Sequence, residues 1–234
     1  MLRLSDSWVW DFWLADDGDR YHLFFLFAAR ALQDERRRHG QAAIGHAVSE
    51  DLWAWERVGD VVAASEAPAF DDVATWTGSV VPGPDDDRGV VGHAVSPDLH
   101  RWEVRPPLSR PGSGFGHLEC PQVATVEDRQ VLLFSCLDPQ FSAARRGTGA
   151  TGGILYVPIH SPTGPFDIAA ASPLTSDAFY CGRLVSDRSG RPVLLAFHYF
   201  DQRRQFRGEL SDPMPVRWEN GELRVADGPA RGRM

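Results

Sequence analysis

The chain has 234 residues, of which 43% are hydrophobic, so its length and composition indicate one sizeable globular domain over 1–234 rather than a disordered chain. Its formal net charge of −8 argues against nucleic acid as a partner, because phosphate binding is driven by clustered Lys and Arg. Neutral sugars make no such demand on the charge of a protein.

The lack of a recognisable targeting signal and the small number of cysteines predict a reduced, cytoplasmic setting. The longest apolar runs, such as 23–29, are too short to span a bilayer, so no membrane association is expected. The N-terminus lacks the basic region and apolar region of a signal peptide. Three cysteines, Cys120, Cys136 and Cys181, cannot all pair with one another, and their spacing is not that of a metal site.

Short runs rich in β-branched and aromatic residues, separated by turn clusters, predict β-strands along the whole chain. The predicted strands cover 20–28, 42–49, 75–81, 89–96, 130–136, 153–160 and 191–199. Asn220-Gly221, between 216–219 and 222–225, is a strong signal for a two-residue hairpin turn. Only 28–38 carries a helical pattern, and we interpret its Arg36-Arg37-Arg38 run as a solvated loop. The sequence therefore predicts an all-β fold.

An internal repeat refines this fold class. The segment 44–49, followed by Asp51-Leu52 and Trp55-Glu56, recurs as 91–96, followed by Asp98-Leu99 and Trp102-Glu103. The offset, measured from Gly45 to Gly92, is 47 residues. A period of about 40–50 residues that holds several strands is typical of a β-propeller blade. Two similar hairpins in a β-sandwich are the alternative.

Two acidic residues stand in unusual surroundings. Asp11 lies among the aromatic residues of 8–13, and Glu119 opens the tripeptide Glu119-Cys120-Pro121. An aspartate between apolar rings is costly unless it is paired or functional, although it could also cap a turn. A buried structural salt bridge is the alternative for Glu119. One ionised carboxylate, one protonated carboxyl and flat rings that stack on sugar are what glycosidic bond cleavage requires.

These motifs resemble those of the fructan-acting glycosidases, namely the invertases and levanases of glycoside hydrolase family 32 and their levansucrase relatives. The stretch 10–13 is similar to the levansucrase-type motif that carries the nucleophilic aspartate. The segment 70–79, with Trp76-Thr77-Gly78-Ser79, resembles the Trp-Ser-Gly-Ser segment that lines the sugar pocket, and Glu119-Cys120-Pro121 matches the motif of the general acid/base. The resemblance extends from Trp8 to Val225 and implies a five-bladed β-propeller.

One family motif is missing. In the family an Arg-Asp-Pro motif, whose aspartate holds two hydroxyls of the fructosyl ring, lies between the sugar-pocket segment and the acid/base motif. No Arg-Asp-Pro occurs in this chain, and Leu137-Asp138-Pro139 falls after Glu119, in the wrong place. Roughly one blade, on the order of 40 residues, is therefore missing around 83–89. We predict an incomplete propeller of about four blades, and we expect the family's C-terminal β-sandwich to be absent.

The resemblance implies a retaining two-carboxylate mechanism on the β-fructofuranosyl units of sucrose or fructans. Asp11 would be the nucleophile and Glu119 the general acid/base, with their carboxyl groups about 5–5.5 Å apart. Burial would raise the pKa of Glu119, while hydrogen bonds would keep Asp11 ionised. The residues expected to bind the fructoside, a small molecule or an oligosaccharide, are Trp10, Trp13, Trp76, Ser79, His117 and Cys120.

Two other functions fit the same motifs. A degenerate propeller that binds sugar without turning it over would follow from the missing motif. A related propeller glycosidase that acts on pentose polymers would invert, with carboxylates about 6.5–9.5 Å apart. His46 and His93 occupy equivalent positions of the repeat, so we interpret them as structural residues rather than metal ligands. No phosphate-binding loop, zinc motif or dinucleotide fingerprint occurs, and no cofactor is expected.

Overall fold

The computed structural model describes residues 2–62, 90–91, 93–95 and 103–226. The chain divides into two compact units. Unit 1 comprises Met1–Gly78, Ala178–Arg217 and Arg224–Met234, and unit 2 comprises Ser79–Asp177 and Trp218–Leu223. The strand predicted over 75–81 lies outside the described residues. In the described part of the chain, no helix has the length and apolarity that crossing a bilayer would take.

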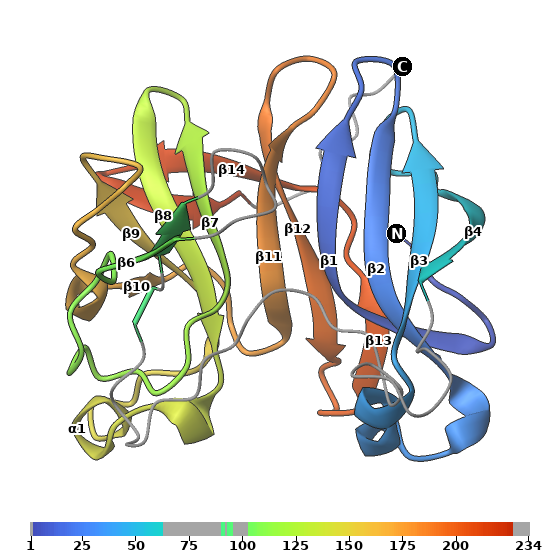
Figure 1. Ribbon diagram of the computed structural model, residues 1–234, viewed down its shortest axis with the longest axis horizontal. Helices are drawn as coiled ribbons and strands as arrows, with labels where there is room; N and C mark the ends of the chain where they lie inside the picture. The colour runs from blue at the N-terminus through green and yellow to red at the C-terminus, as the bar shows by residue number, and fades with distance from the viewer. Residues whose placement is uncertain (1, 63–89, 92, 96–102, 227–234) are drawn as a thin grey trace. The chain divides into compact units, whose positions relative to one another are not determined.

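The first sheet, in unit 1, is an antiparallel meander of four strands in chain order (Figure 1). Its strands are β1 Ser7–Asp16, β2 Tyr21–Ala29, β3 Ala43–Ser49 and β4 Glu56–Val62. The turn between β1 and β2 forms because the Asp17 carboxylate accepts hydrogen bonds from the backbone N–H groups of Asp19 and Arg20, at 2.9 and 2.7 Å.

The second sheet, in unit 2, has the strand order β10-β9-β8-β7. Its strands are β7 Glu119–Val126, β8 Arg129–Cys136, β9 Gly153–Ile159 and β10 Ser172–Pro173. Phe115, Phe134 and Phe141 are almost fully buried against it. Phe115 packs edge-to-face on the other two, with ring centroids 5.2 and 5.3 Å apart. Aromatic packing thus forms the core of unit 2.

The third sheet confirms the predicted hairpin. Its order is β11-β12-β14-β15, with β13 paired to β12. The strands are β11 Phe179–Ser186, β12 Pro192–Phe200, β13 Phe206–Leu210, β14 Met214–Glu219 and β15 Glu222–Val225. Asn220 and Gly221 connect β14 to β15 with φ of 52° and 83°, and two positive φ values are what a type I′ turn requires. The all-β class predicted from the sequence is confirmed.

The helices in the described part of the chain are short. The 3-10 helices are η1 Arg30–Leu32, η2 Glu35–Gln41, η3 Asp138–Gln140 and η4 Ile168–Ala170, and the α-helix is α1 Ala143–Arg146. The helical pattern of 28–38 therefore corresponds to parts of η1 and η2. The interpretation of the arginine run as solvated is wrong for Arg38, which is only 6% exposed, because its guanidinium lies over the rings of Trp10 and Phe206.

The repeat found in the sequence forms two hairpins of matching register. The first copy is β3–β4, and the second is β5 His93–Val95 with β6 Glu103–Arg105. Val48 pairs with Glu56 in the first hairpin, and Val95 pairs with Glu103 in the second. Val95 follows Val48 by 47 residues and Glu103 follows Glu56 by 47 residues, the same offset that separates Gly92 from Gly45. The repeat in the sequence is therefore matched by a repeat in the pairing of the strands.

The Ser-x-Asp-Leu turn of the first copy is held by side-chain caps. The Ser49 hydroxyl accepts a hydrogen bond from the Leu52 N–H at 2.9 Å, and Asp51 accepts from Trp53 and Ala54 at 2.8 and 2.9 Å. These bonds hold Leu52 at a φ of 67°, a conformation uncommon for leucine, and its side chain is fully buried. In this first copy, the serine, the aspartate and the leucine of the motif each have a part in the turn.

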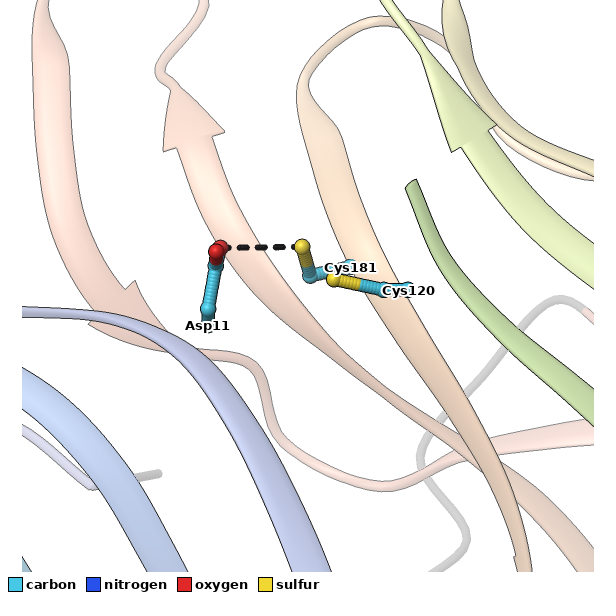
Figure 2. A group of neighbouring side chains, drawn as sticks. All are labelled: Asp11, Cys120 and Cys181. Atoms are coloured by element: carbon cyan, nitrogen blue, oxygen red, sulfur yellow. Dashed lines mark hydrogen bonds between the residues drawn. The ribbon is translucent and has the colours of Figure 1, made fainter. Parts of the chain in front are cut away.

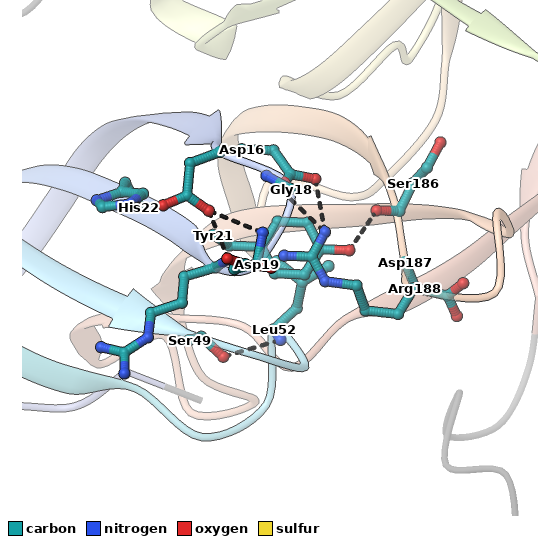
Figure 3. A network of polar contacts seen from close by, with 12 residues as sticks. Asp16, Gly18, Asp19, Tyr21, His22, Ser49, Leu52, Ser186, Asp187 and Arg188 are labelled. Atoms are coloured by element: carbon teal, nitrogen blue, oxygen red, sulfur yellow. Dashed lines mark hydrogen bonds and ion pairs between the residues drawn. The ribbon is translucent and has the colours of Figure 1, made fainter.

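Unit 1 joins its two groups of strands through polar contacts at their turns. Figure 3 shows Arg188, after β11, paired with Asp16 at the end of β1, at 2.8 Å. The guanidinium also lies 3.8 Å from the ring centroid of Tyr21, whose hydroxyl donates to the Ser186 carbonyl at 2.9 Å. These contacts fix the β1–β2 turn against the β11–β12 turn, within the same unit as Asp11.

The Glu209 carboxylate in β13 is 1% exposed and forms a network that includes the N-terminal segment. It accepts from Arg207 Nε at 2.8 Å and lies 3.4 Å from Arg3. We expect Glu209→Gln to lower the free energy of unfolding by about 1.5–3 kcal/mol, since a hydrogen bond to a charged group contributes that much. Urea unfolding measures the loss. Asp128→Asn, at a side chain that is 90% exposed, is the control and should change the value by less than about 0.5 kcal/mol.

A row of contacting rings, joined by one hydrogen bond and by stacking, crosses the first sheet. His22 Nε2 lies 3.0 Å from Asp17 Oδ2, and His22 Nδ1 lies 3.0 Å from His46 Nε2. The His46 ring stacks on Phe24, which stacks on Trp13, with centroids 4.7 and 5.6 Å apart. Burial, and secondly the charge of His22, lower the pKa of His46.

The histidine pair makes stability depend on pH in a defined direction. Because the folded pKa of His46 lies below its unfolded value of about 6.5, the unfolded chain takes up the proton more readily. The stabilisation is therefore complete above about pH 6.5 and is lost as the pH falls below it. We expect His46→Gln to flatten the decline in urea midpoint between pH 7 and 5. The same change at exposed His160 should leave the decline as it is, and an equal slope in wild type and His46→Gln would contradict the assignment.

Candidate functional site

Asp11 is positioned by an irregularity in β1. Trp10 pairs with Leu26 and Phe12 pairs with Phe25, so Asp11 is the extra residue of a β-bulge. Bulges turn a side chain out of the regular alternation of a strand and are frequent beside active sites. Trp10 and Phe12 are each 2% exposed, whereas Asp11 is half-buried. The bulge thus holds a carboxylate at the edge of an aromatic core.

The thiol of Cys181, in β11, holds the Asp11 carboxylate. Figure 2 shows the contact, in which Sγ donates to Oδ1 at 2.9 Å. Burial raises the pKa of Asp11, and the hydrogen bond from Cys181 opposes this rise. The sequence analysis expected hydrogen bonds to keep Asp11 ionised. The bond from Cys181 acts in that direction, while the loss of hydration acts against it and has the larger effect on the pKa.

Two arginines supply positive potential near Asp11. Arg38 of η2 and Arg183 of β11 both favour the ionised carboxylate. Arg183 Nε donates to the Phe12 carbonyl at 3.2 Å, which ties β11 to the bulge of β1. Burial lowers the pKa of Arg38, while Tyr199 and Asp11 favour its charged form. The aspartate therefore lies in an apolar environment that still supports a negative charge.

The two tryptophans that flank Asp11 have different surroundings. Trp10 is 2% exposed, with the Arg38 guanidinium 5.4 Å from its ring centroid and the ring of His39 at 6.2 Å. Its ring is therefore buried against these two groups. Trp13 is half-buried and is stacked on Phe24, so its ring is the more exposed of the two. The roles of Trp10 and Trp13 in binding a sugar stay predictions.

Glu119 begins β7 in unit 2 and has a histidine partner. His117 Nδ1 lies 3.3 Å from Glu119 Oε1, with side chains 27% and 23% exposed. This contact places His117 where its ring can orient the Glu119 carboxylate. Cys120 follows with a φ of 51°, at a register shift between Glu119 and Gln122. The second acidic residue thus also stands beside a bulge.

The predicted site residues fall into three groups. Asp11, Trp10 and Trp13 lie together on β1 of unit 1, and Glu119, His117 and Cys120 lie together in unit 2. Trp76 and Ser79 lie outside the described residues. The expected separation of about 5–5.5 Å between the two carboxyl groups stays a prediction.

No disulfide joins Cys120, Cys136 and Cys181 to one another. From the sequence we expected only that the three could not all pair. Burial raises the pKa of Cys136 to about 12, so it stays a neutral thiol.

Sequence reasoning missed Cys181, Arg183 and Arg38. The first two were visible only as part of Tyr180-Cys181-Gly182-Arg183, where no spacing pattern links them to a residue 170 positions earlier. A signal for Arg38 existed in the aromatic residues of 8–13, since a desolvated arginine commonly stacks on such rings. In the Leu137-Asp138-Pro139 tripeptide, which the sequence analysis set aside, Asp138 accepts a hydrogen bond from the Gly152 backbone N–H.

Comparison with solved structures identifies the fold. An inulosucrase from Halalkalicoccus jeotgali, bound to kestose, superposes with a TM-score of 0.70 at 16% identity, over 99% of this chain and 90% of the other. The chain has a fructosidase-type fold. No protein-family model and no curated protein matches the sequence itself. The likeness is therefore one of fold at low identity, and it confirms the resemblance that the motifs indicated.

Two family 32 and fructan-degrading enzymes extend the likeness. A GH32 β-fructofuranosidase from Bombyx mori gives a TM-score of 0.66 at 14% identity, and this chain covers 63% of its length. Fructan 1-exohydrolase IIa from Cichorium intybus gives 0.66 at 15%, with 59% of its length covered. This chain is matched over 96% and 98% of its own length. The propeller-type fold is confirmed, and the described residues form four sheets, in accord with about four blades.

Proposed function

We propose that this chain is a glycosidase that hydrolyses or transfers β-fructofuranosyl units of sucrose or fructans. The observation that carries the proposal is the Asp11 carboxylate, held at a β-bulge by the Cys181 thiol in a fructosidase-type fold. A half-buried carboxylate with a raised pKa and nearby arginines is typical of a functional group rather than of a turn cap.

In the first step, Asp11 attacks the anomeric carbon of the fructosyl unit. The carboxylate oxygen forms a bond to that carbon while the bond to the leaving oxygen breaks. Glu119 gives its proton to the leaving oxygen, so the aglycone departs as a neutral alcohol. Arg38 and Arg183 keep Asp11 ionised before the attack, despite the loss of hydration.

In the second step, water or a sugar hydroxyl attacks the same carbon. Glu119, now ionised, takes the proton from the attacking oxygen, and the bond to Asp11 breaks. The Asp11 carboxylate and the protonated Glu119 are restored. His117, 3.3 Å from Glu119, is placed to hold its orientation through both proton transfers.

Turnover by the purified chain tests the proposal. Sucrose, inulin and levan are supplied in turn, and released fructose and new oligosaccharides are followed by chromatography. We expect turnover of at least one of them, with the first-formed fructose in the β configuration, as two successive inversions require. First-formed product of inverted configuration would instead favour the related enzymes that act on pentose polymers, and these polymers would then be tested as substrates.

A second candidate is a sugar-binding propeller without turnover, favoured by the missing Arg-Asp-Pro motif. Loss of a group that stabilises the transition state costs about 3–4 kcal/mol, hence a hundredfold to a thousandfold in rate. Calorimetric titration with kestose separates the candidates. Binding without turnover supports this second function, and the absence of both binding and turnover overturns both.

A further inference from the structure

The three large sheets share one irregularity. In each sheet, the first strand in the chain lies at one end of the strand order and carries one residue more than its partner. The register shifts occur at Trp10/Phe12 in β1, Glu119/Gln122 in β7 and Tyr180/Arg183 in β11. The bulges of β1 and β7 hold or adjoin the two acidic residues. The bulge of β11 contains Cys181, and we therefore ask whether this residue also contributes to the site.

The backbone of the β11 bulge places a cysteine in an uncommon conformation. Cys181 has a φ of 47°, in the left-handed region that non-glycine residues rarely adopt. Such a conformation is energetically unfavourable for a residue with a side chain, and it persists where the surrounding structure enforces it. The adjacent Gly182 could adopt it without that cost. Cys181 nevertheless adopts this conformation, and its side chain is fully buried and bonded to Asp11.

The contact between Cys181 and Asp11 is specific. Sγ lies 2.9 Å from Oδ1, which is short for a thiol donor (Figure 2). Among the described residues, Cys181 is the side chain that donates a hydrogen bond to this carboxylate, while Arg38 and Arg183 act through their charge. Arg183, two residues further along, binds the Phe12 carbonyl and so holds the two bulges together.

We propose that Cys181 is a positioning residue for Asp11: its thiol fixes Oδ1 and thereby presents Oδ2 for bond formation. The inference rests on the proposed function and names a residue that supports the nucleophile. The thiol keeps its proton throughout, because Asp11 leaves and regains its ionised form without proton exchange. A neutral donor holds the carboxylate without the strong charge pairing that would make it a poorer nucleophile.

Two substitutions separate positioning from packing. Cys181→Ser keeps a donor of similar size, whereas Cys181→Ala removes it, and a β-branched residue is avoided because of the positive φ. The groups that face Asp11 are Arg38 from η2 and Arg183 from β11, with Tyr199 of β12 beside Arg38. These groups stay in place in both variants. Removal of the thiol therefore raises the pKa of Asp11, and serine keeps it close to that of wild type.

Carboxyl 13C NMR titration measures this effect without any substrate. The Asp11 signal is assigned by its loss in Asp11→Asn, and its titration is compared in wild type, Cys181→Ala and Cys181→Ser. We expect a higher midpoint in the alanine variant alone. For each fructoside turned over, kcat/KM of the alanine variant should fall about 10- to 100-fold, with its acid limb displaced to higher pH, and serine should restore most of it.

The two readouts keep this inference distinct from the proposed function. A shifted midpoint in a protein that turns over no fructoside supports the role of Cys181 and counts against the glycosidase. Turnover with an unchanged midpoint in Cys181→Ala overturns the positioning role. Thermal unfolding of each variant accompanies the titration. The serine and alanine variants could also lose activity equally, with equal stability and with unchanged midpoints for Asp11. That result would show that Cys181 acts through packing alone, and it would also overturn the positioning role.

Discussion

Asp11→Asn is expected to lower kcat for any accepted fructoside by at least about 10,000-fold, because removal of a covalent nucleophile has effects of this size. Asparagine has the shape of aspartate but cannot form the glycosyl-enzyme. Its side-chain oxygen can still accept the hydrogen bond from Cys181, so the bulge of β1 should keep its structure. Initial rates on sucrose, inulin and levan, under saturating conditions, provide the measurement.

Asp19→Asn is the matched control for this change. Asp19 is an exposed aspartate of the β1–β2 turn, and its backbone N–H, rather than its side chain, caps that turn. Its substitution should leave kcat within about twofold of wild type, as expected for a surface change. Unimpaired turnover by folded Asp11→Asn, verified by circular dichroism, would remove Asp11 from the reaction.

Glu119→Gln is expected to lower kcat by roughly 100- to 10,000-fold, the usual contribution of a general acid/base. The loss should be smallest for substrates with a good leaving group, such as a fructosyl fluoride, because their departure needs little protonation. The pH–rate profile should also lose the limb that reports the proton of Glu119. Rates on sucrose and on the fluoride, measured from pH 4 to 8 (roughly the range over which carboxyl and imidazole groups titrate), test these points.

A second glutamate of unit 2 provides the comparison. Glu127 lies in the turn between β7 and β8, is exposed, and has a φ of 58°. Glu127→Gln should leave both rates unchanged. An equal loss on sucrose and fluoride in Glu119→Gln would argue that Glu119 binds substrate instead of transferring a proton.

Local chemistry made much of the fold predictable. The Asn220-Gly221 turn, the Ser-x-Asp-Leu caps and the 47-residue repeat are each specified by neighbouring residues, and the structure contains all of them except those in the second copy that lie outside the described residues. Asp11 was recognisable because an acid among aromatic residues carries its own energetic signal. Glu119 was recognisable with its neighbours Cys120 and Pro121.

The support of Asp11 could not be predicted in the same way. Cys181 and Arg183 reach it from β11, and the contact depends on a register shift and a positive φ that cysteine does not encode locally. Arg38 was assigned to solvent because it belongs to a run of three arginines. Arg36 and Arg37 are indeed exposed, whereas Arg38 turns inward to cover Trp10. Long-range packing decided these positions, and with them the direction in which the pKa of Asp11 moves.

Trapping the glycosyl-enzyme is the most direct test of Asp11 as the nucleophile. Glu119→Gln is incubated with a fructosyl fluoride, so that the first step proceeds while the second lacks its base. The protein is then digested and its peptides are examined by mass spectrometry. We predict one added fructosyl unit on the peptide that contains Asp11, and none when Asp11 is also replaced by Asn. A fructosyl unit attached to a different residue, or retained in the double variant, would contradict the assignment.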